Sequence, residues 1–199
     1  VVQIVNAAYE GAIRGMLIQG ENPAMSDPDA HHARQALARL EHLVVVDIFL
    51  TETAALADVV LPATAWPEKS GTVTNTDRHV QLGRKAIPAP GQARADLWIT
   101  AQIARRIGLN WAYEIDPTGG EKGVGQVYEE MRGLMPSIAG ITWDRLQRDG
   151  AATYPNRHPE DPGQRVVFTD RFPTDDGLAH LVPAQMGWPA EPTDEEYPL

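Results

Sequence analysis

The chain has 199 residues, 43% of them hydrophobic, which is enough for one α/β domain with a core of ordinary size but leaves little room for a second. Its 17 Lys and Arg residues and 27 Asp and Glu residues give a formal charge of −10, which argues against broad binding of nucleic acid or anionic membranes. The chain has no cysteine, which excludes disulfides, cysteine-type zinc sites and iron–sulfur clusters bound by this chain alone.

The sequence also lacks membrane and metal signals. No apolar run approaches the roughly 20 residues of a membrane-spanning helix. The opening segment has neither the basic stretch nor the cleavage site of a signal peptide. The six histidines show no metal-like spacing, and His31 and His32 are adjacent, so they cannot share one helix face. We therefore expect a soluble, cytoplasmic chain with no membrane insertion and no metal ligand of its own.

In the first third of the chain, apolar strands alternate with helices. Strands are expected at residues 16–18, 43–46 and 59–61. Helices are expected at residues 2–12, from residue 27 onward and at 53–57. Asp27 is well suited to cap the second helix, and Pro28 to occupy its first position. Strands that are apolar throughout and alternate with helices predict a parallel sheet covered by helices on both faces.

The later part of the chain reads first as helical and then as irregular. Helices are expected at residues 96–107, at about 123–134 and at 141–148. From Ala151 onward the apolar pieces are short, and half of the chain's 16 prolines lie there. We therefore expect an α/β domain over residues 1–150 and an extended Pro-rich connecting segment over residues 151–199.

The segment from Trp66 to Arg78, WPEKSGTVTNTDR, allows two interpretations. Its lysine–glutamate pair, its glycine and its run of hydroxyl and amide side chains suit a surface that binds a polar, phosphorylated ligand. Alternatively, WPEKSG forms a tight turn and TVTNT an ordinary edge strand, because Ser-Gly favours turns and Thr and Val favour strands.

Polar residues follow each of the three predicted strands. Gly20 to Pro23 follow the first, Asp47 follows the second, and Trp66 to Lys69 follow the third. In open parallel sheets, ligands bind beyond the carboxyl ends of the strands. A carboxylate there can accept paired hydrogen bonds from the ring N–H and the exocyclic NH₂ of a guanine or pterin edge. Backbone N–H groups in the glycine loop and at helix starts can meet a diphosphate.

Two long stretches carry a resemblance to a known family. The stretch ADVVLPATAWPEKSGTVTNTDRHVQLGRKAIPAPGQARADLW, with MLIQGENPAMSDPD before it, resembles the molybdopterin-binding region of the large subunit of molybdenum oxidoreductases. Within that superfamily, VVVDIFLTETAALADVVLPATAWPEKSGTVTNTDR and MPSIAGITWDRLQRDGAATYP are most similar to the catalytic alpha subunit of NAD-dependent formate dehydrogenases. The resemblance implies a Rossmann-like fold, with a domain over residues 1–150 that binds molybdopterin guanine dinucleotide.

The resemblance also implies the activity of the whole enzyme. Formate would be oxidised to CO₂ at a molybdenum or tungsten ion held by a bis-molybdopterin guanine dinucleotide cofactor. Electrons would leave through iron–sulfur clusters bound by missing N-terminal sequence, toward flavin and NAD⁺ on partner subunits. The chain would then be an internal fragment, inactive alone, whose residues 151–199 lead to a missing C-terminal cofactor-capping domain. No catalytic residue is expected on it.

Four positions near the ends of the first two strands match family positions that contact the cofactor. Glu21 matches a polar residue that contacts the dinucleotide, although a loop carboxylate in water would look the same. Val46 and Asp47 match a pair at a strand end that faces the guanosine, with a turn or N-cap role as the alternative for Asp47. Thr51 follows on the same loop, where capping of the next helix would explain it equally well.

Two further cofactor-binding positions are carried over from the later motif. Lys69 would offer a charge to a phosphate or a hydrogen bond to a ribose, and its alternative is a solvated turn lysine. Asp96 would meet the nucleotide, but it is also well placed to cap the following helix. We expect Asp77 and Arg78 to form mainly a structural ion pair. Tyr128 and Trp143, which lie on predicted helices, are expected to serve packing.

Three other functions remain open from the sequence. A nitrate reductase or another molybdenum oxidoreductase would share these residues and differ in substrate. A cofactor-free electron-transfer scaffold, like the large peripheral subunit of respiratory NADH dehydrogenases, would keep the fold without the cofactor. A stand-alone nucleotide-binding regulatory domain is disfavoured because the Pro-rich tail has no evident core on which to pack.

Overall fold

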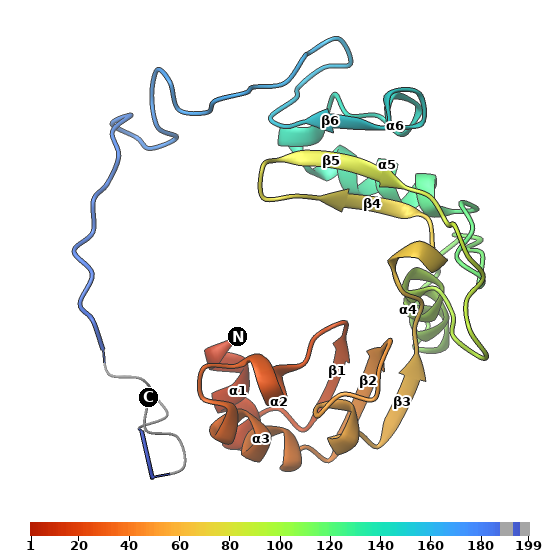
Figure 1. Ribbon diagram of the computed structural model, residues 1–199, viewed down its shortest axis with the longest axis vertical. Helices are drawn as coiled ribbons and strands as arrows, with labels where there is room; N and C mark the ends of the chain where they lie inside the picture. The colour runs from red at the N-terminus through yellow and green to blue at the C-terminus, as the bar shows by residue number, and fades with distance from the viewer. Residues whose placement is uncertain (188–192, 196–199) are drawn as a thin grey trace. The chain divides into compact units, whose positions relative to one another are not determined.

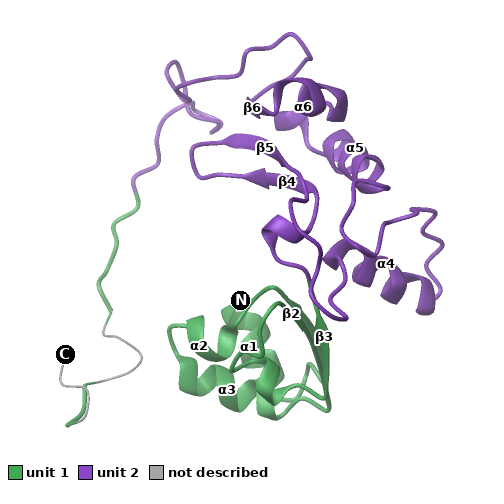
Figure 2. Cartoon of the chain, turned by 45° about the vertical axis from the view of Figure 1, so that its right-hand side comes forward, with its two compact units in different colours: residues 1–63, 182–199 green, residues 64–181 purple. Residues whose placement is uncertain are grey.

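The structure is a computed structural model that describes residues 1–187 and 193–195 (Figure 1). The chain forms two compact units (Figure 2). Unit 1 comprises Val1–Ala63 together with residues 182–199, and unit 2 comprises Thr64–Leu181. The division therefore falls directly after the third strand, whereas the sequence analysis placed a boundary at residue 150. No helix in the described residues is long and apolar enough to cross a membrane.

Unit 1 contains a three-stranded parallel sheet with the strand order β1-β2-β3. Its strands are β1 (Gly15–Gln19), β2 (His42–Asp47) and β3 (Val59–Pro62). Its helices are α1 (Val2–Tyr9), α2 (Pro23–Ser26), α3 (Ala30–Ala38) and the 3₁₀ turn η1 (Ala54–Leu56). All three predicted strands are present, and they pair in parallel as expected.

Helix α3 begins later than the sequence analysis predicted. The prediction that Asp27 caps the helix and Pro28 opens it is wrong. Asp29 is the N-cap instead, and its carboxylate accepts a hydrogen bond of 3.0 Å from the backbone N–H of His32. A cap needs a side-chain oxygen within reach of the first free N–H groups, and here the second of two aspartates in DPD has that position.

The core of unit 1 lies on one face of its parallel sheet. Ile18 and Val45 from the strands pack there against Leu37 of α3 and Ala24 of α2. On the opposite face, Leu17 is 45% exposed and Val59 is 38% exposed. Val46 on that same face is nevertheless fully buried, so the prediction of helices on both faces stays a prediction. An apolar strand signals that both faces can be buried, but it does not say which segment covers each of them.

Unit 2 contains a second sheet, which the sequence analysis did not predict. Its antiparallel strands lie in the order β4-β5-β6. They are β4 (Gly71–Thr74), β5 (His79–Gly83) and β6 (Ala151–Thr153). The remaining elements are η2 (Trp66–Glu68), α4 (Asp96–Arg106), α5 (Val124–Leu134), η3 (Pro136–Ile138) and α6 (Trp143–Asp149). The three predicted helices of this region are present.

Strand β6, from the later part of unit 2, pairs with β5 from its early part. Gln81 of β5 pairs with Ala151, and His79 pairs with Thr153. Behind this sheet, side chains from β5, α5 and α6 form the core. That core contains Val80, Leu82, Tyr128, Ile138, Ile141, Leu146 and Ala152, with Trp143 and Tyr154 packed against it. The expectation that Tyr128 and Trp143 serve packing is thus confirmed.

The segment after β6 is held by side-chain hydrogen bonds. Asn156 is fully buried, and its amide oxygen accepts a hydrogen bond of 3.1 Å from Arg145 of α6. The same guanidinium donates to the carbonyl oxygens of Pro159 and Asp161, each at 3.0 Å. Residues 154–187 contain no helix or strand. The predicted extended segment therefore begins after β6 rather than at Ala151.

Candidate functional site

In unit 1, the loops that follow β1 and β2 lie at the same edge of the sheet, because the two strands are parallel. Gly20 ends β1 with a φ of 66°, a left-handed conformation that favours glycine. Its N–H donates a hydrogen bond of 2.9 Å to the carbonyl oxygen of Val46. Glu21 therefore comes directly after a residue that is bonded to the end of β2. The structure thus brings Glu21, Val46 and Asp47 to one edge.

These strand-end residues differ in what they can offer a ligand. Val46 has a fully buried side chain. Asp47 is half-buried, and one of its carboxylate oxygens accepts a hydrogen bond of 2.7 Å from Ile48 N–H. Its other oxygen has no hydrogen-bond partner in the described part of the chain. Glu21 is exposed and lines an apolar cavity of 410 Å³ beside α1 and β1. Two carboxylates are therefore available as acceptors.

Thr51 has the local role that the sequence analysis left open. Its hydroxyl oxygen accepts a hydrogen bond of 3.2 Å from Ala54 N–H at the start of η1. Its carbonyl oxygen accepts another, of 2.8 Å, from Ala55 N–H. Thr51 thus caps the turn, and the structure gives its hydroxyl a partner within the protein.

A polar network that sequence reasoning missed connects the two loops. The amide oxygen of Asn22 accepts hydrogen bonds from the hydroxyl and the N–H of Thr53, at 2.7 and 3.1 Å. The Asn22 amide nitrogen donates to Glu52 at 2.8 Å. Thr53 is fully buried, and its hydroxyl accepts a hydrogen bond of 3.0 Å from Ala24 N–H. The only sequence signal for this network is that an asparagine and a threonine each follow a predicted strand.

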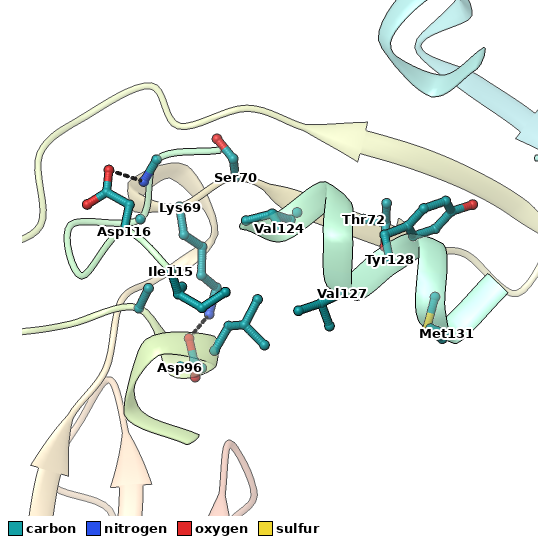
Figure 3. Close-up of a pocket in the computed structure, with 15 residues that line it drawn as sticks. Lys69, Ser70, Thr72, Asp96, Ile115, Asp116, Val124, Val127, Tyr128 and Met131 are labelled. Carbon is teal, nitrogen blue, oxygen red and sulfur yellow. Dashed lines mark hydrogen bonds and ion pairs between the residues drawn. The ribbon is translucent and has the colours of Figure 1, made fainter. Parts of the chain in front are cut away.

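In unit 2, the structure pairs the other two predicted site residues. The ammonium group of Lys69 forms an ion pair with the carboxylate of Asp96 and donates a hydrogen bond of 2.8 Å to the carbonyl oxygen of Thr64. The two side chains of the pair are 31% and 22% exposed. They lie at a cavity of 230 Å³ that Ile115 and residues of α5 also line, among them Val127 and Met131 (Figure 3).

Asp96 is the first residue of α4 rather than its cap. Ala95 occupies the N-cap position, and no side chain caps the helix. The prediction that Asp96 acts as the N-cap is therefore wrong, although a carboxylate in the first turn still interacts favourably with the helix dipole. Its second carboxylate oxygen has no partner among the described residues. Lys69, with three N–H donors, also has one donor left after its two contacts.

A tight loop supports the backbone around Lys69. Ser70 N–H donates a hydrogen bond of 2.7 Å to the carbonyl oxygen of Gly119. Gly119 has a φ of 88°, and a Cβ there would overlap the Glu68 carbonyl oxygen and lie 2.9 Å from Lys69 Cα. Only glycine allows so close an approach in this conformation. The motif WPEK is thus held from behind by residues 50 positions later in the chain.

Asp116 organises that loop. Its carboxylate accepts hydrogen bonds of 2.8 Å from both the N–H and the hydroxyl of Thr118, and one of 3.2 Å from Gly120 N–H. The N–H and hydroxyl of Thr118 are the main reason that the pKa of Asp116 lies below its ordinary value. Lys85 donates a hydrogen bond of 2.6 Å to the carbonyl oxygen of Thr118 on the same loop.

The expected ion pair between Asp77 and Arg78 is not formed in the described part of the chain. Asp77 pairs instead with His79 at 3.5 Å. Arg78 donates hydrogen bonds of 2.8 Å to the carbonyl oxygens of Tyr154 and Arg165. Its φ of 68° turns its side chain away from its neighbour and toward the segment after β6. Residues 75–78 thus form the turn of the β4–β5 hairpin, while the TVT of the edge strand in the second interpretation of WPEKSGTVTNTDR lies in β4.

The charged groups at the two sites are carboxylates and one ammonium group. No group of three or more His, Asp or Glu side chains that could hold a metal ion occurs among the described residues. Tyr128 beside the cavity in unit 2 donates a hydrogen bond of 2.7 Å to the carbonyl oxygen of Ile141, and burial raises its pKa to about 12. The Tyr128 hydroxyl thus has a structural role. What both sites do offer is carboxylate and ammonium groups suited to polar ligand recognition.

Comparison with known proteins agrees on one family. The molybdopterin oxidoreductase profile matches residues 1–106. An F420-dependent formate dehydrogenase subunit alpha of Methanocaldococcus jannaschii is 42% identical over 94% of this chain and 27% of that protein. The assimilatory nitrate reductase catalytic subunit of Bacillus subtilis is 34% identical over 99% of this chain and 28% of that protein. Formate dehydrogenase H of Escherichia coli is 31% identical over 99% of this chain and 27% of that protein.

A solved structure shows the same fold. Acetylene hydratase from Pelobacter acetylenicus superposes with a TM-score of 0.58 over 82% of this chain and 22% of that chain, at 20% sequence identity. The chain thus spans only about a quarter of the length of the relatives that it matches. Because the profile match covers more than half of its residues, the chain belongs to the molybdopterin oxidoreductase family.

Proposed function

We propose that this chain is part of the catalytic subunit of a molybdenum- or tungsten-dependent formate dehydrogenase, in which it binds the guanine dinucleotide part of a bis-molybdopterin cofactor. The observation that carries the proposal is the 42% identity to a formate dehydrogenase alpha subunit over 94% of this chain. The match runs through both units, so it includes both candidate sites.

The residues at both sites fit such a cofactor. At the edge of the sheet in unit 1, Asp47 has a carboxylate oxygen without a partner among the described residues, and Glu21 is exposed. Carboxylates in such positions can accept the paired N–H groups of a guanine or pterin edge. In unit 2, Lys69 has a donor available for a phosphate oxygen or a ribose hydroxyl, beside Asp96. A chain with a net charge of −10 must recognise phosphate through such local groups.

The chain's own part in the reaction would be binding and orientation. When bound, the cofactor and its metal supply the redox chemistry, while the protein supplies position and electrostatics. No residue of this chain is proposed as catalytic. Iron–sulfur clusters would be held by other parts of the enzyme, since the chain has no cysteine. We also propose a cytoplasmic location.

The electron acceptor has two candidates. Resemblance to NAD-dependent formate dehydrogenases favours NAD⁺, reached through iron–sulfur and flavin-containing partner subunits. The names of three relatives that are 39 to 42% identical favour F420 instead. The 34% identity to a nitrate reductase subunit keeps nitrate open as an alternative substrate, with reduction in place of formate oxidation.

One experiment separates these possibilities. The parent enzyme is purified without oxygen, its molybdenum, tungsten and acid-released GMP are quantified, and formate-dependent reduction of NAD⁺ and of F420 is assayed alongside nitrate reduction. Metal, GMP and formate oxidation support the proposal, and the faster acceptor identifies the electron route. Cofactor without formate oxidation contradicts the substrate. Absence of both metal and GMP contradicts cofactor binding and favours a scaffold role.

A further inference from the structure

The start of α2 is capped in an unusual way. Asn22 occupies the N-cap position, where an asparagine side chain ordinarily accepts a hydrogen bond from the helix's own free N–H groups. Here the Asn22 side chain makes no such bond. The hydroxyl of Thr53, 29 residues away from Ala24, accepts the hydrogen bond from Ala24 N–H at 3.0 Å. The cap of α2 is thus supplied by the loop that follows β2.

The Asn22 side chain is directed at that same loop. Its amide oxygen accepts hydrogen bonds from Thr53 N–H at 3.1 Å and from the Thr53 hydroxyl at 2.7 Å. Its amide nitrogen donates to Glu52 at 2.8 Å, and this bond is the main reason that the pKa of Glu52 is lowered. The Thr53 hydroxyl therefore uses both its donor and its acceptor capacity, in a position that is fully buried.

We infer that Asn22 and Thr53 are positioning residues that hold the two strand-end loops of unit 1 in a fixed arrangement for the cofactor. This inference rests on the proposed function. Asn22 directly follows Glu21, and Thr53 lies at the end of the loop that Asp47 begins. Hydrogen bonds between the two loops therefore restrict the separation of the two carboxylates. We name this pair, Asn22 with Thr53, the loop clamp.

Burial makes displacement of the two loops costly. A buried donor or acceptor that loses its partner bears the full cost of desolvation, so a displaced loop would leave the buried N–H of Ala24 and the buried hydroxyl of Thr53 without partners. The carboxylates of Glu21 and Asp47 lie at the same edge of the sheet and carry like charges, and any repulsion between them favours separation of the loops before a ligand with N–H donors arrives. A clamp of neutral groups opposes that separation without adding charge to the site.

The test compares two fully buried threonines in the parent enzyme. Thr53→Val removes the clamp hydroxyl at nearly constant volume. Thr64→Val is the matched control, because the Thr64 hydroxyl is equally buried and has no hydrogen-bond partner among the described residues. Thr53→Ser keeps the hydroxyl and serves as the conservative rescue, and Asn22→Ala removes the other half of the clamp.

Two readouts are measured for each variant: amide hydrogen exchange over residues 20–26 and 47–54, and GMP retained per protein after extended gel filtration. For Thr53→Val and Asn22→Ala we expect exchange to accelerate by about tenfold in both loops, the equivalent of roughly one lost hydrogen bond, together with faster loss of GMP. Thr53→Ser should resemble the wild type, and so should Thr64→Val.

The outcomes separate two kinds of failure. If wild-type enzyme contains no GMP, the proposed function is contradicted, and the positioning role with it. If wild-type enzyme retains GMP and Thr53→Val retains it equally well, the loop clamp has no positioning role. Faster exchange in residues 47–54 alone, with residues 20–26 unchanged, also overturns the inference, because the two loops would then move independently. Equal losses of GMP in Thr53→Val and Thr64→Val would also overturn the inference, because the loss would then be a general effect of altering a buried threonine.

Discussion

The two candidate sites differ in whether their charged groups are paired within the protein. In unit 1, the carboxylates of Glu21 and Asp47 keep acceptor atoms that no other described residue contacts, and the neutral loop clamp orders the loops that bear them. In unit 2, Lys69 and Asp96 satisfy each other, and a glycine loop supports the lysine from behind. The first site can bind a donor-rich ligand without losing an internal bond. The second must share or exchange an ion pair when it binds.

The comparison predicts that support by the glycine loop matters most for stability in unit 2. Gly119→Ala should lower the free energy of unfolding by about 3 kcal/mol, because the new methyl group overlaps Glu68 and also strains a φ of 88°. Gly108→Ala is the matched control, with a φ of 89° and no atom within 4 Å of the added Cβ. It should cost only about 1 kcal/mol. Chemical denaturation measures both, and equal losses would show that only backbone strain matters.

The ion pair in unit 2 should contribute more than a surface pair. Lys69→Met leaves a mostly buried carboxylate without its partner, and we expect a loss of about 1–2 kcal/mol. Lys122→Met is the control, because the Lys122–Glu114 pair is solvent-exposed and its loss should cost little. A double-mutant cycle with Asp96→Asn checks the coupling. A coupling energy near zero would mean that the two groups do not act as a pair.

At the strand-end site of unit 1, substitution of Asp47 should affect ligand retention and leave stability unchanged. In the parent enzyme, Asp47→Asn should speed the loss of GMP by about tenfold or more, since the amide replaces one acceptor oxygen by an NH₂ donor and removes the negative charge that strengthens these hydrogen bonds. Asp58→Asn at the opposite end of the same sheet is the control; the Asp58 carboxylate accepts a hydrogen bond from Leu43 N–H. Unchanged GMP content in Asp47→Asn would remove Asp47 from the binding site.

Acid should weaken the support of Lys69 only as the carboxylate of Asp116 becomes protonated. The pKa of Asp116 is lowered in the folded chain by the N–H and hydroxyl of Thr118. Its contribution is therefore fully present above the ordinary aspartate pKa of about 3.9, and it is lost as the pH falls through the lower folded value. Thermal melts from pH 6 to about pH 3 should show a small loss for the wild type that Asp116→Asn lacks. Parallel curves for the two proteins would contradict this origin.

The smallest effect is expected at Thr64. Its hydroxyl is fully buried and has no hydrogen-bond partner among the described residues. Thr64→Val therefore removes a desolvated group without breaking a bond, and stability should stay the same or rise by up to about 1 kcal/mol. Thr53→Val, which removes the two hydrogen bonds of the Thr53 hydroxyl, should instead be destabilising in the same thermal melts. A marked loss for Thr64→Val would reveal a partner for its hydroxyl.

Much of the local structure was predictable. The three apolar strands, their parallel pairing and the helices α4, α5 and α6 follow from periodicity, because the spacing of apolar residues reports which face of an element is buried. Glu21, Asp47 and Val46 were correctly expected at one edge, since parallel strands share the edge at which they end. The capping residue of α3 was misplaced, because two aspartates in DPD suit the same role.

Length, composition and periodicity thus determined an acidic, cysteine-free α/β chain with a parallel sheet and polar strand ends, because those properties depend on residues close together in sequence. Tertiary packing alone decided the rest. It joined β5 to β6, it paired Lys69 with Asp96, and it placed Asn22 against Thr53. Each of these contacts joins residues at least 27 positions apart, and no local pattern encodes which distant partner will satisfy a polar group or cover an apolar face.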